Sequence, residues 1–117
     1  MTVKPLIWVG SSLDDVRAFP PEARRITGHQ LDRIQQGKEP DDWKAMASVG
    51  TGVYELRVRT VVEHRVFYIA KFQEAIYVLH AFQKRSQRTR QSDIALAKER
   101  HKQLQRFRRA KRKEQGS

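Results

Sequence analysis

Cationic side chains recur in the second half of the chain at positions where they could bind phosphate together. Arg57 and Arg59 are two residues apart, Arg65 follows after a polar stretch, and Lys84 precedes Arg85 at the end of a third β-rich run. Guanidinium and ammonium groups hold phosphate and neutralise the charge that develops on it during reaction. RNA needs no metal for its cleavage, because its 2′-hydroxyl is an internal nucleophile beside the scissile phosphorus. The pattern therefore predicts a phosphate-binding site suited to RNA.

Proton transfer at such a site needs a second kind of side chain, and three residues are candidates: Glu55, Tyr68 and His80. His80 lies in an apolar run, so a hydrogen-bonded core histidine is a competing interpretation. Tyr68 follows Phe67 in a β-rich run, and neighbouring strand residues face opposite sides, so one of these two rings packs in the core. The pattern alone does not choose among the three proton carriers.

Thiol and metal chemistry have little support in the sequence. The chain has no cysteine, and its four histidines are scattered without the spacing of metal ligands. We therefore expect no metal site and no cofactor. The first apolar run is too short for a signal sequence or a membrane span, so we expect a cytoplasmic protein.

The net charge of +11 arises entirely after residue 58. Through Val58 the chain has eight Lys and Arg against eight Asp and Glu, and beyond it has sixteen against five. A field of this sign concentrates polyanions at the surface, so nucleic acid, an anionic membrane and an acidic protein are all possible partners. The side chains expected to contact nucleic acid outside the catalytic set are Arg59, Arg85, Arg88 and Arg90.

The first half of the chain is expected to form one strand and two helices. Residues 4–9 form a β-branched and aromatic run followed by Gly10, which predicts a strand and then a break. Ser12 is expected to cap a short helix that ends at the Pro20-Pro21 pair. A second helix begins at Pro21 and ends near Gly37.

The second half is expected to contain a β-meander and a long helix. Three β-rich runs, 53–60, 65–72 and 75–84, are separated by short polar turns. Apolar residues at helical spacing then predict a helix from Ser92-Asp93 to about residue 108. The segment 44–49 could be a loop or an irregular edge strand. We expect one domain over residues 1–108 and a basic, frayed tail over 109–117.

These elements predict an α+β fold of order β-α-α-β-β-β-α, in which the helices pack on one face of a twisted antiparallel sheet to make two layers. In the first meander run Glu55, Arg57 and Arg59 share one face by the period-two rule. Adjacent strands lie about 5 Å apart, so cations on neighbouring strands can converge there.

The meander resembles the RelE/ParE superfamily of bacterial toxins, and within it the phage-derived HigB-like branch. The matching stretches are residues 54–59 (YELRVR), 65–70 (RVFYIA) and 78–87 (VLHAFQKRSQ), in the family's order and spacing. The resemblance implies a RelE-like fold. The chain departs from the best-studied members of the family at two points. It has Glu55 where they have a basic residue, and it has no tyrosine after Tyr77.

The resemblance further implies the toxin of a type II toxin–antitoxin module, a metal-independent endoribonuclease that cleaves messenger RNA on the ribosome. It implies a HigA-like helix-turn-helix antitoxin as partner, with operator DNA bound only through that antitoxin and no membrane contact. By position, Arg57 resembles the basic residue of the family's second-strand motif, Arg65 its phosphate-binding arginine, and Lys84-Arg85 the basic pair that closes its last strand. The catalytic set is then Arg57, Arg65, Tyr68, His80 and Lys84.

Two alternatives share the same fold. A ParE-like protein would poison DNA gyrase without nuclease activity, and an inactive member would only bind its antitoxin and DNA. The cations at the strand ends favour the nuclease, whereas the missing C-terminal tyrosine is the observation that motivates the inactive member.

Overall fold

The computed structural model describes residues 3–116 of the chain. In chain order the elements are β1 (Leu6–Trp8), α1 (Ser12–Arg17), α2 (Pro21–Gln35), β2 (Trp43–Ala45), β3 (Val53–Arg59), β4 (Glu63–Ile69), β5 (Ile76–Lys84) and α3 (Gln91–Gly116). Each element expected from the sequence is present. The segment 44–49, which sequence patterns left open, begins inside β2, a short edge strand.

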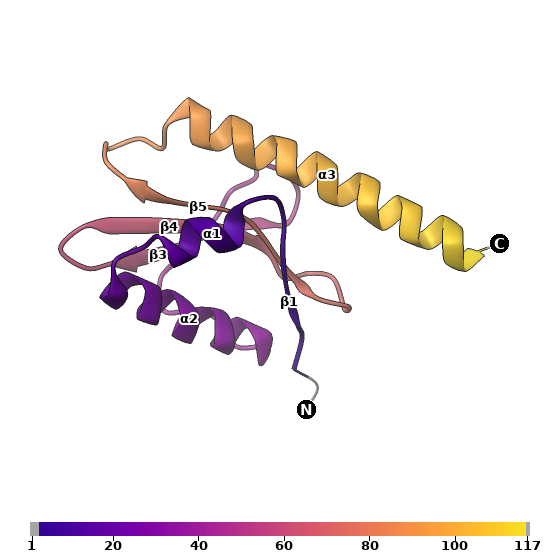
Figure 1. The fold of residues 1–117 in the computed structure, drawn as a ribbon, viewed down its shortest axis with the longest axis horizontal. Helices are drawn as coiled ribbons and strands as arrows, with labels where there is room; N and C mark the ends of the chain where they lie inside the picture. Colours follow the sequence, from indigo (N-terminus) through magenta and orange to yellow (C-terminus); the bar gives the residue numbers. More distant parts are fainter. Residues whose placement is uncertain (1–2, 117) are drawn as a thin grey trace.

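The strands form one mixed sheet in the order β1-β5-β4-β3-β2 (Figure 1). The predicted antiparallel meander is confirmed for β3, β4 and β5, and β2 pairs antiparallel with β3. The sheet is not antiparallel throughout, because β1 pairs in parallel with β5. This pairing joins segments about seventy residues apart and leaves no local sequence pattern, so the sequence could not indicate it.

Helices cover both faces of the sheet, and each face has its own apolar cluster (Figure 1). As predicted, the N-terminal helices α1 and α2 pack on one face, where Val16 and Leu31 meet Val66. On the other face Ala97 and Leu104 of α3 pack with Leu79. The predicted α+β class is confirmed, while α3 adds a third layer to the two that were expected, because α1 and α2 leave that apolar face uncovered.

The helix ends follow capping rules with one correction. Pro21 opens α2 at its first turn, and Gly37, at φ +81°, ends it with its N–H donating to the carbonyl of Ile34. Ser12, expected as the cap of α1, is instead the first helical residue, and its buried Oγ donates to the carbonyl of Val78 at 3.0 Å. The capping position belongs to Ser11.

A bulge in β5 determines which side chains face α3. Phe67 pairs with His80 but Tyr68 pairs with Val78, so Leu79 is the extra residue between the two pairs. Leu79 joins the apolar cluster under α3, and His80 bonds Asp93 in the first turn of that helix. Two successive residues of β5 therefore point toward α3, which simple strand alternation would not predict.

The last helix projects beyond the sheet (Figure 1). α3 runs without a break from Gln91 to Gly116, and none of the described helices is long and apolar enough to cross a membrane. The division into a domain of residues 1–108 and a frayed tail of residues 109–117 stays a prediction about behaviour in solution; residues 1, 2 and 117 lie outside the described residues.

Candidate functional site

A buried carboxylate joins the two arginines predicted to bind phosphate. Arg57 and Arg65 are direct cross-strand partners on β3 and β4, and Glu55 lies two residues before Arg57 on the same face of the sheet. The Oε1 atom of Glu55 lies 3.2 Å from Nε of Arg57 and 3.4 Å from Nε of Arg65. The convergence predicted from strand spacing is therefore present, and Glu55 is its centre.

Arg65 is the most buried cation of this group. Its side chain is 2% exposed, and only its Nη2 atom forms a hydrogen bond, to Oε2 of Glu63 at 2.8 Å. The Nη1 atom is buried without a hydrogen-bond partner among the described residues, and Nε has only its 3.4 Å ion-pair contact with Oε1 of Glu55. A buried guanidinium with unmet donors is costly, by about 1–3 kcal/mol for each such group, so its retention is a reason to expect an anionic ligand there.

Further carboxylates surround the arginines at the rim of the sheet, by which we mean the end that carries Arg59, Glu63 and Lys84. Nε of Arg59 lies 2.8 Å from Oδ2 of Asp42, and its Nη1 lies 3.4 Å from Oε1 of Glu63. Asp42 also lies 4.0 Å from Arg57. Arg57 and Arg65 therefore lie among several carboxylates, because Asp42 immediately precedes the short strand β2 and Glu63 begins β4.

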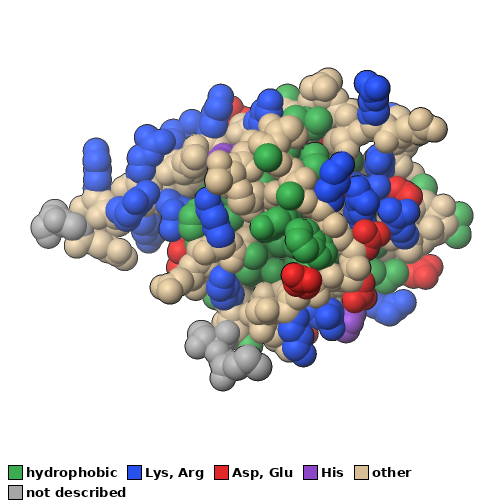
Figure 2. Space-filling view, turned by 180° about the vertical axis from the view of Figure 1, so that it is seen from behind, with side chains coloured by type: hydrophobic (Ala, Val, Ile, Leu, Met, Phe, Trp, Pro, Cys, Tyr) green, Lys and Arg blue, Asp and Glu red, His purple; other side chains and the backbone are tan. Residues whose placement is uncertain are grey.

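The rim is therefore a mixed-charge surface with fixed geometry. Figure 2 shows Lys and Arg side chains beside Asp and Glu side chains at the end of the molecule that carries the β3–β4 turn. Burial opposes the ionisation of Glu63, but Arg65, Arg59 and Lys84 outweigh that effect and lower the pKa of its carboxyl group. Glu63 thus stays charged and keeps these cations oriented.

Lys84 and the loop after β5 extend the rim. Lys84 lies opposite Glu63 in the register of β4 and β5, and Arg85 also lines an open hollow of about 560 Å³ beside them. Arg88 and Arg90 are farther along the same loop, where the carbonyl of Arg90 accepts hydrogen bonds from the first turn of α3. Arg59, Lys84 and Arg85 are thus placed with the arginine pair, whereas Arg88 and Arg90 lead away toward α3.

The aromatic side chains near the arginines are buried and do not form a surface on which bases could stack. Phe67 and Phe82 are buried with ring centroids 5.3 Å apart, and Phe82 is the cross-strand partner of Arg65. Their burial leaves no open face for an unpaired base. They instead supply the dry surroundings in which a guanidinium interacts strongly with an anion.

His80 lies in a buried hydrogen-bond network next to these aromatic rings. Its ring stacks on Phe82, its Nε2 lies 2.8 Å from Oδ1 of Asp93, and its Nδ1 lies 3.3 Å from Nη1 of Arg100. Arg100 is 7% exposed and also donates to the carbonyl of Leu79 at 2.9 Å. Since both ring nitrogens of His80 already contact protein groups, the structure favours the core interpretation over proton transfer.

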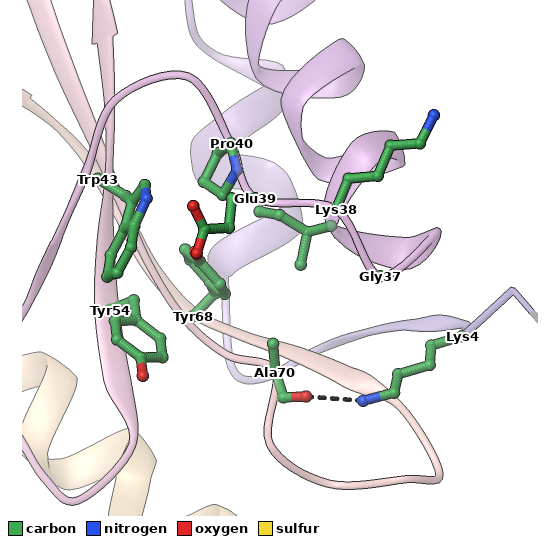
Figure 3. Close-up of a pocket in the computed structure, with 10 residues that line it drawn as sticks. Lys4, Gly37, Lys38, Glu39, Pro40, Trp43, Tyr54, Tyr68 and Ala70 are labelled. Carbon is green, nitrogen blue, oxygen red and sulfur yellow. Dashed lines mark hydrogen bonds between the residues drawn. The ribbon is translucent and has the colours of Figure 1, made fainter.

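Tyr68 lies on the opposite face of the sheet, in the cluster under α1 and α2. It lines a pocket of about 250 Å³ with Tyr54 and Trp43, as Figure 3 shows. Burial raises the pKa of the Tyr68 hydroxyl well above its ordinary value, so it is a poor proton carrier near neutral pH. The structure therefore separates Tyr68 from the other four residues of the predicted catalytic set.

The part of the chain that carries this geometry is shared with a known family. Residues 14–102 match the family described as phage derived protein Gp49-like (DUF891). The chain belongs to this Gp49-like family. The family is part of the RelE/ParE-like toxin superfamily and is associated with toxin–antitoxin modules, and its toxins are generally of the RNase type. No curated protein matches the chain.

The match places the arginine pair within the part of the chain that is shared with the Gp49-like family. Glu55, Arg57, Arg65 and Lys84 all lie inside residues 14–102. The family thus supports the toxin class and an antitoxin partner, as the resemblance of the meander had implied.

Sequence patterns missed several residues that shape the site. Asp42 is fifteen residues from Arg57, and Arg100 and Asp93 lie on the far side of a loop from His80. The pattern around Asp93 indicated only the start of a helix. An exposed-looking, basic stretch of α3 gave no signal that Arg100 would be buried.

Proposed function

We propose that this chain is the toxin of a type II toxin–antitoxin module of the HigB-like branch, and that it is a metal-independent endoribonuclease acting on messenger RNA at the ribosome. The observation that carries the proposal is the buried Arg65, which lies beside Arg57 and whose Nη1 has no hydrogen-bond partner among the described residues. A phosphate that displaced Glu55 would meet the donors of both arginines in a dry site. The Gp49-like family membership supports the same class of activity.

In the proposed reaction Arg65 and Arg57 bind the scissile phosphate and neutralise the charge that accumulates on its oxygens. Glu55, released from the arginines when the phosphate enters, accepts the proton of the 2′-hydroxyl. That hydroxyl oxygen attacks phosphorus, the bond to the 5′ oxygen breaks, and the products carry a 2′,3′-cyclic phosphate and a 5′-hydroxyl that takes its proton from solvent. Lys84 adds a third cation at the rim.

The remaining predicted residues have other roles in this proposal. His80 binds the first turn of α3 through Asp93 and so fixes the position of that turn relative to Phe82. Tyr68 takes no part, because it lies on the other face of the sheet. Arg59, Arg85, Arg88 and Arg90 guide RNA along the rim and the loop after β5.

The proposed partners follow from the toxin class. A HigA-like helix-turn-helix antitoxin holds the toxin inactive and carries operator DNA, so the toxin itself needs no DNA-reading element. The proposed location is the cytoplasm, where messenger RNA and ribosomes are found.

Mapping of RNA 5′ ends after brief induction tests this function. The wild-type chain should produce new ends within coding frames. Arg57→Gln should abolish them, because it removes one of the two cations that bind the scissile phosphate. Arg25→Gln is the matched control, since it removes the same charge from an exposed position of α2 and should leave the ends unchanged. Thermal unfolding of the purified variants establishes that they are folded.

Two results would overturn the proposal. Arrested growth with intact messages and an induced SOS response would point to gyrase. Intact messages with normal growth would leave only antitoxin binding.

A further inference from the structure

A second cationic pocket lies between α3 and two loops. It is separate from the arginine site, which is formed by Glu55, Arg57 and Arg65. Its volume is about 240 Å³, and it lies against the turn after Val49 and the β4–β5 loop. Five of its lining residues are cationic or titratable: Lys71, His101, Arg108, Arg109 and Arg112. No carboxylate lines the pocket among the described residues, in contrast to the arginine site with its Glu55, Glu63 and Asp42.

Two glycines make room for the side chains of this pocket. A Cβ atom at Gly50 would lie 2.8 Å from the His101 ring, and one at Gly52, whose φ is +79°, would lie 2.8 Å from Cδ of Lys71. Any larger residue in this turn would displace these two side chains. The turn thus lies directly against the His101 ring and the Lys71 side chain.

Arg108 is fixed in place at the edge of the pocket. Its guanidinium carbon lies 3.5 Å from the centroid of the Phe72 ring, and its Nε donates to Oε2 of Glu74 at 2.8 Å. The hydrogen bond from Arg108 lowers the pKa of Glu74 to about 2, so the pair remains ionic at neutral pH. Arg109 and Arg112, in contrast, are exposed, and neither forms an ion pair with the carboxylates that hold Arg106 and Arg108.

The pocket lies far along α3 from Asp93, the residue of its first turn that bonds His80. The fifteen residues from Asp93 to Arg108 span about 22 Å of helix. Figure 2 shows Lys and Arg side chains gathered along the part of the molecule where α3 projects. The match to the Gp49-like family ends at residue 102, so Arg108, Arg109 and Arg112 belong to a part of the chain beyond it.

We propose that this pocket is a second anion site, which binds a backbone phosphate of RNA at a distance from the arginine pair. The inference rests on the proposed function in naming RNA as the source of the phosphate. A strand that followed α3 from Asp93 to Arg108 would cover about 22 Å, which is about six stacked nucleotides. Such a site adds affinity without reading sequence and holds the strand while Arg57 and Arg65 act on another phosphate.

Binding of uncleavable RNA tests the inference. The probe is a fluorescent single strand of about twelve nucleotides, long enough for both sites, with methylated 2′-hydroxyls that cannot attack phosphorus. The double variant Arg109→Gln/Arg112→Gln should bind it about tenfold more weakly, and the slope of log affinity against log salt should fall by about 0.7 for each phosphate that the protein no longer neutralises. Lys98→Gln/Lys102→Gln is the control, since it removes the same charge from exposed positions of α3 outside the pocket and should change affinity no more than about twofold.

The imidazole resonances of His101 report occupancy of the pocket itself. They should shift when the RNA strand is added to the wild-type protein, and not when it is added to Arg109→Gln/Arg112→Gln. Equal loss of affinity in the two double variants would overturn the inference, because the effect would then be general attraction. A shift with inorganic phosphate and none with the strand would overturn RNA as the ligand.

The outcome is separable from that of the proposed function. If 5′-end mapping shows no cleavage but the strand still binds at His101, the nuclease assignment fails and the anion site stands. If RNA is cleaved but the His101 resonances do not respond to the strand, the nuclease assignment stands and the anion site fails.

Discussion

Glu55 is the residue on which the candidate site depends. It is 3% exposed, and one of its oxygens lies within 3.4 Å of two guanidinium groups. Sequence alternation predicted that Glu55, Arg57 and Arg59 share a face, and the resemblance assigned phosphate binding to Arg57 and Arg65. Neither could predict that a single carboxylate would lie between the arginines of two strands, because a period of two gives the face of a residue and not its cross-strand partner.

Replacement of Glu55 tests this arrangement. Glu55→Gln should destabilise the protein by about 3–5 kcal/mol, because it breaks a buried ion pair and leaves Arg65 with only the partly exposed Glu63 as a counter-charge. It should also abolish RNA cleavage, since the proton acceptor is lost, while the freed arginines keep or increase their affinity for inorganic phosphate. Urea unfolding and phosphate titration of the purified variant measure the two effects.

Glu99→Gln is the control for Glu55→Gln. Glu99 is exposed and pairs at the surface with Arg106, so its loss should change the free energy of unfolding by less than about 1 kcal/mol. An unfolding free energy of Glu55→Gln equal to that of wild type would contradict the assigned network.

At the scale of elements, the docking of α3 decides the shape of the site. Arg100 reaches from α3 to the carbonyl of Leu79 and to Oγ of Ser11, and so ties the helix to β5 and to the turn before α1. The spacing of Ala97 and Leu104 predicted a packed stripe on this helix. It could not tell on which face of the sheet the stripe would pack, because both faces carry apolar residues.

Gly10 provides a test of this docking. Its φ is +58°, and a Cβ atom there would lie 2.6 Å from Nε of Arg100, so Gly10→Ala should destabilise the protein by about 1–3 kcal/mol. Gly28→Ala should act in the opposite direction, by about 0.5–1 kcal/mol, because Gly28 is inside α2 with open space around it. Thermal or urea unfolding compares the two variants, and a Gly10→Ala protein as stable as wild type would contradict both the left-handed turn at Gly10 and the position of Arg100 beside it.

At the scale of the whole molecule, a three-layer fold carries cations on two separate surfaces. The meander, the terminal helices and the basic second half were predictable, because each leaves a local pattern of alternation, spacing or charge. The parallel pairing of β1 and the contacts of Arg108 with Glu74 and Phe72 were not, since both join segments distant in the sequence. The mixed charge of the arginine site also means that the net charge of +11 acts mainly through α3 and the loop before it.

The chemistry of the cut ends tests the central claim most directly. RNA cleaved by the wild-type protein should carry a 2′,3′-cyclic phosphate and a 5′-hydroxyl, and a single 2′-deoxy nucleotide at the cleavage position should prevent the cut, because the internal nucleophile is then absent. End-group analysis of the cut RNA, with Arg57→Gln as the inactive comparison, makes this measurement. Ends bearing a 3′-hydroxyl and a 5′-phosphate, or cleavage that persists at the deoxy position, would contradict the account.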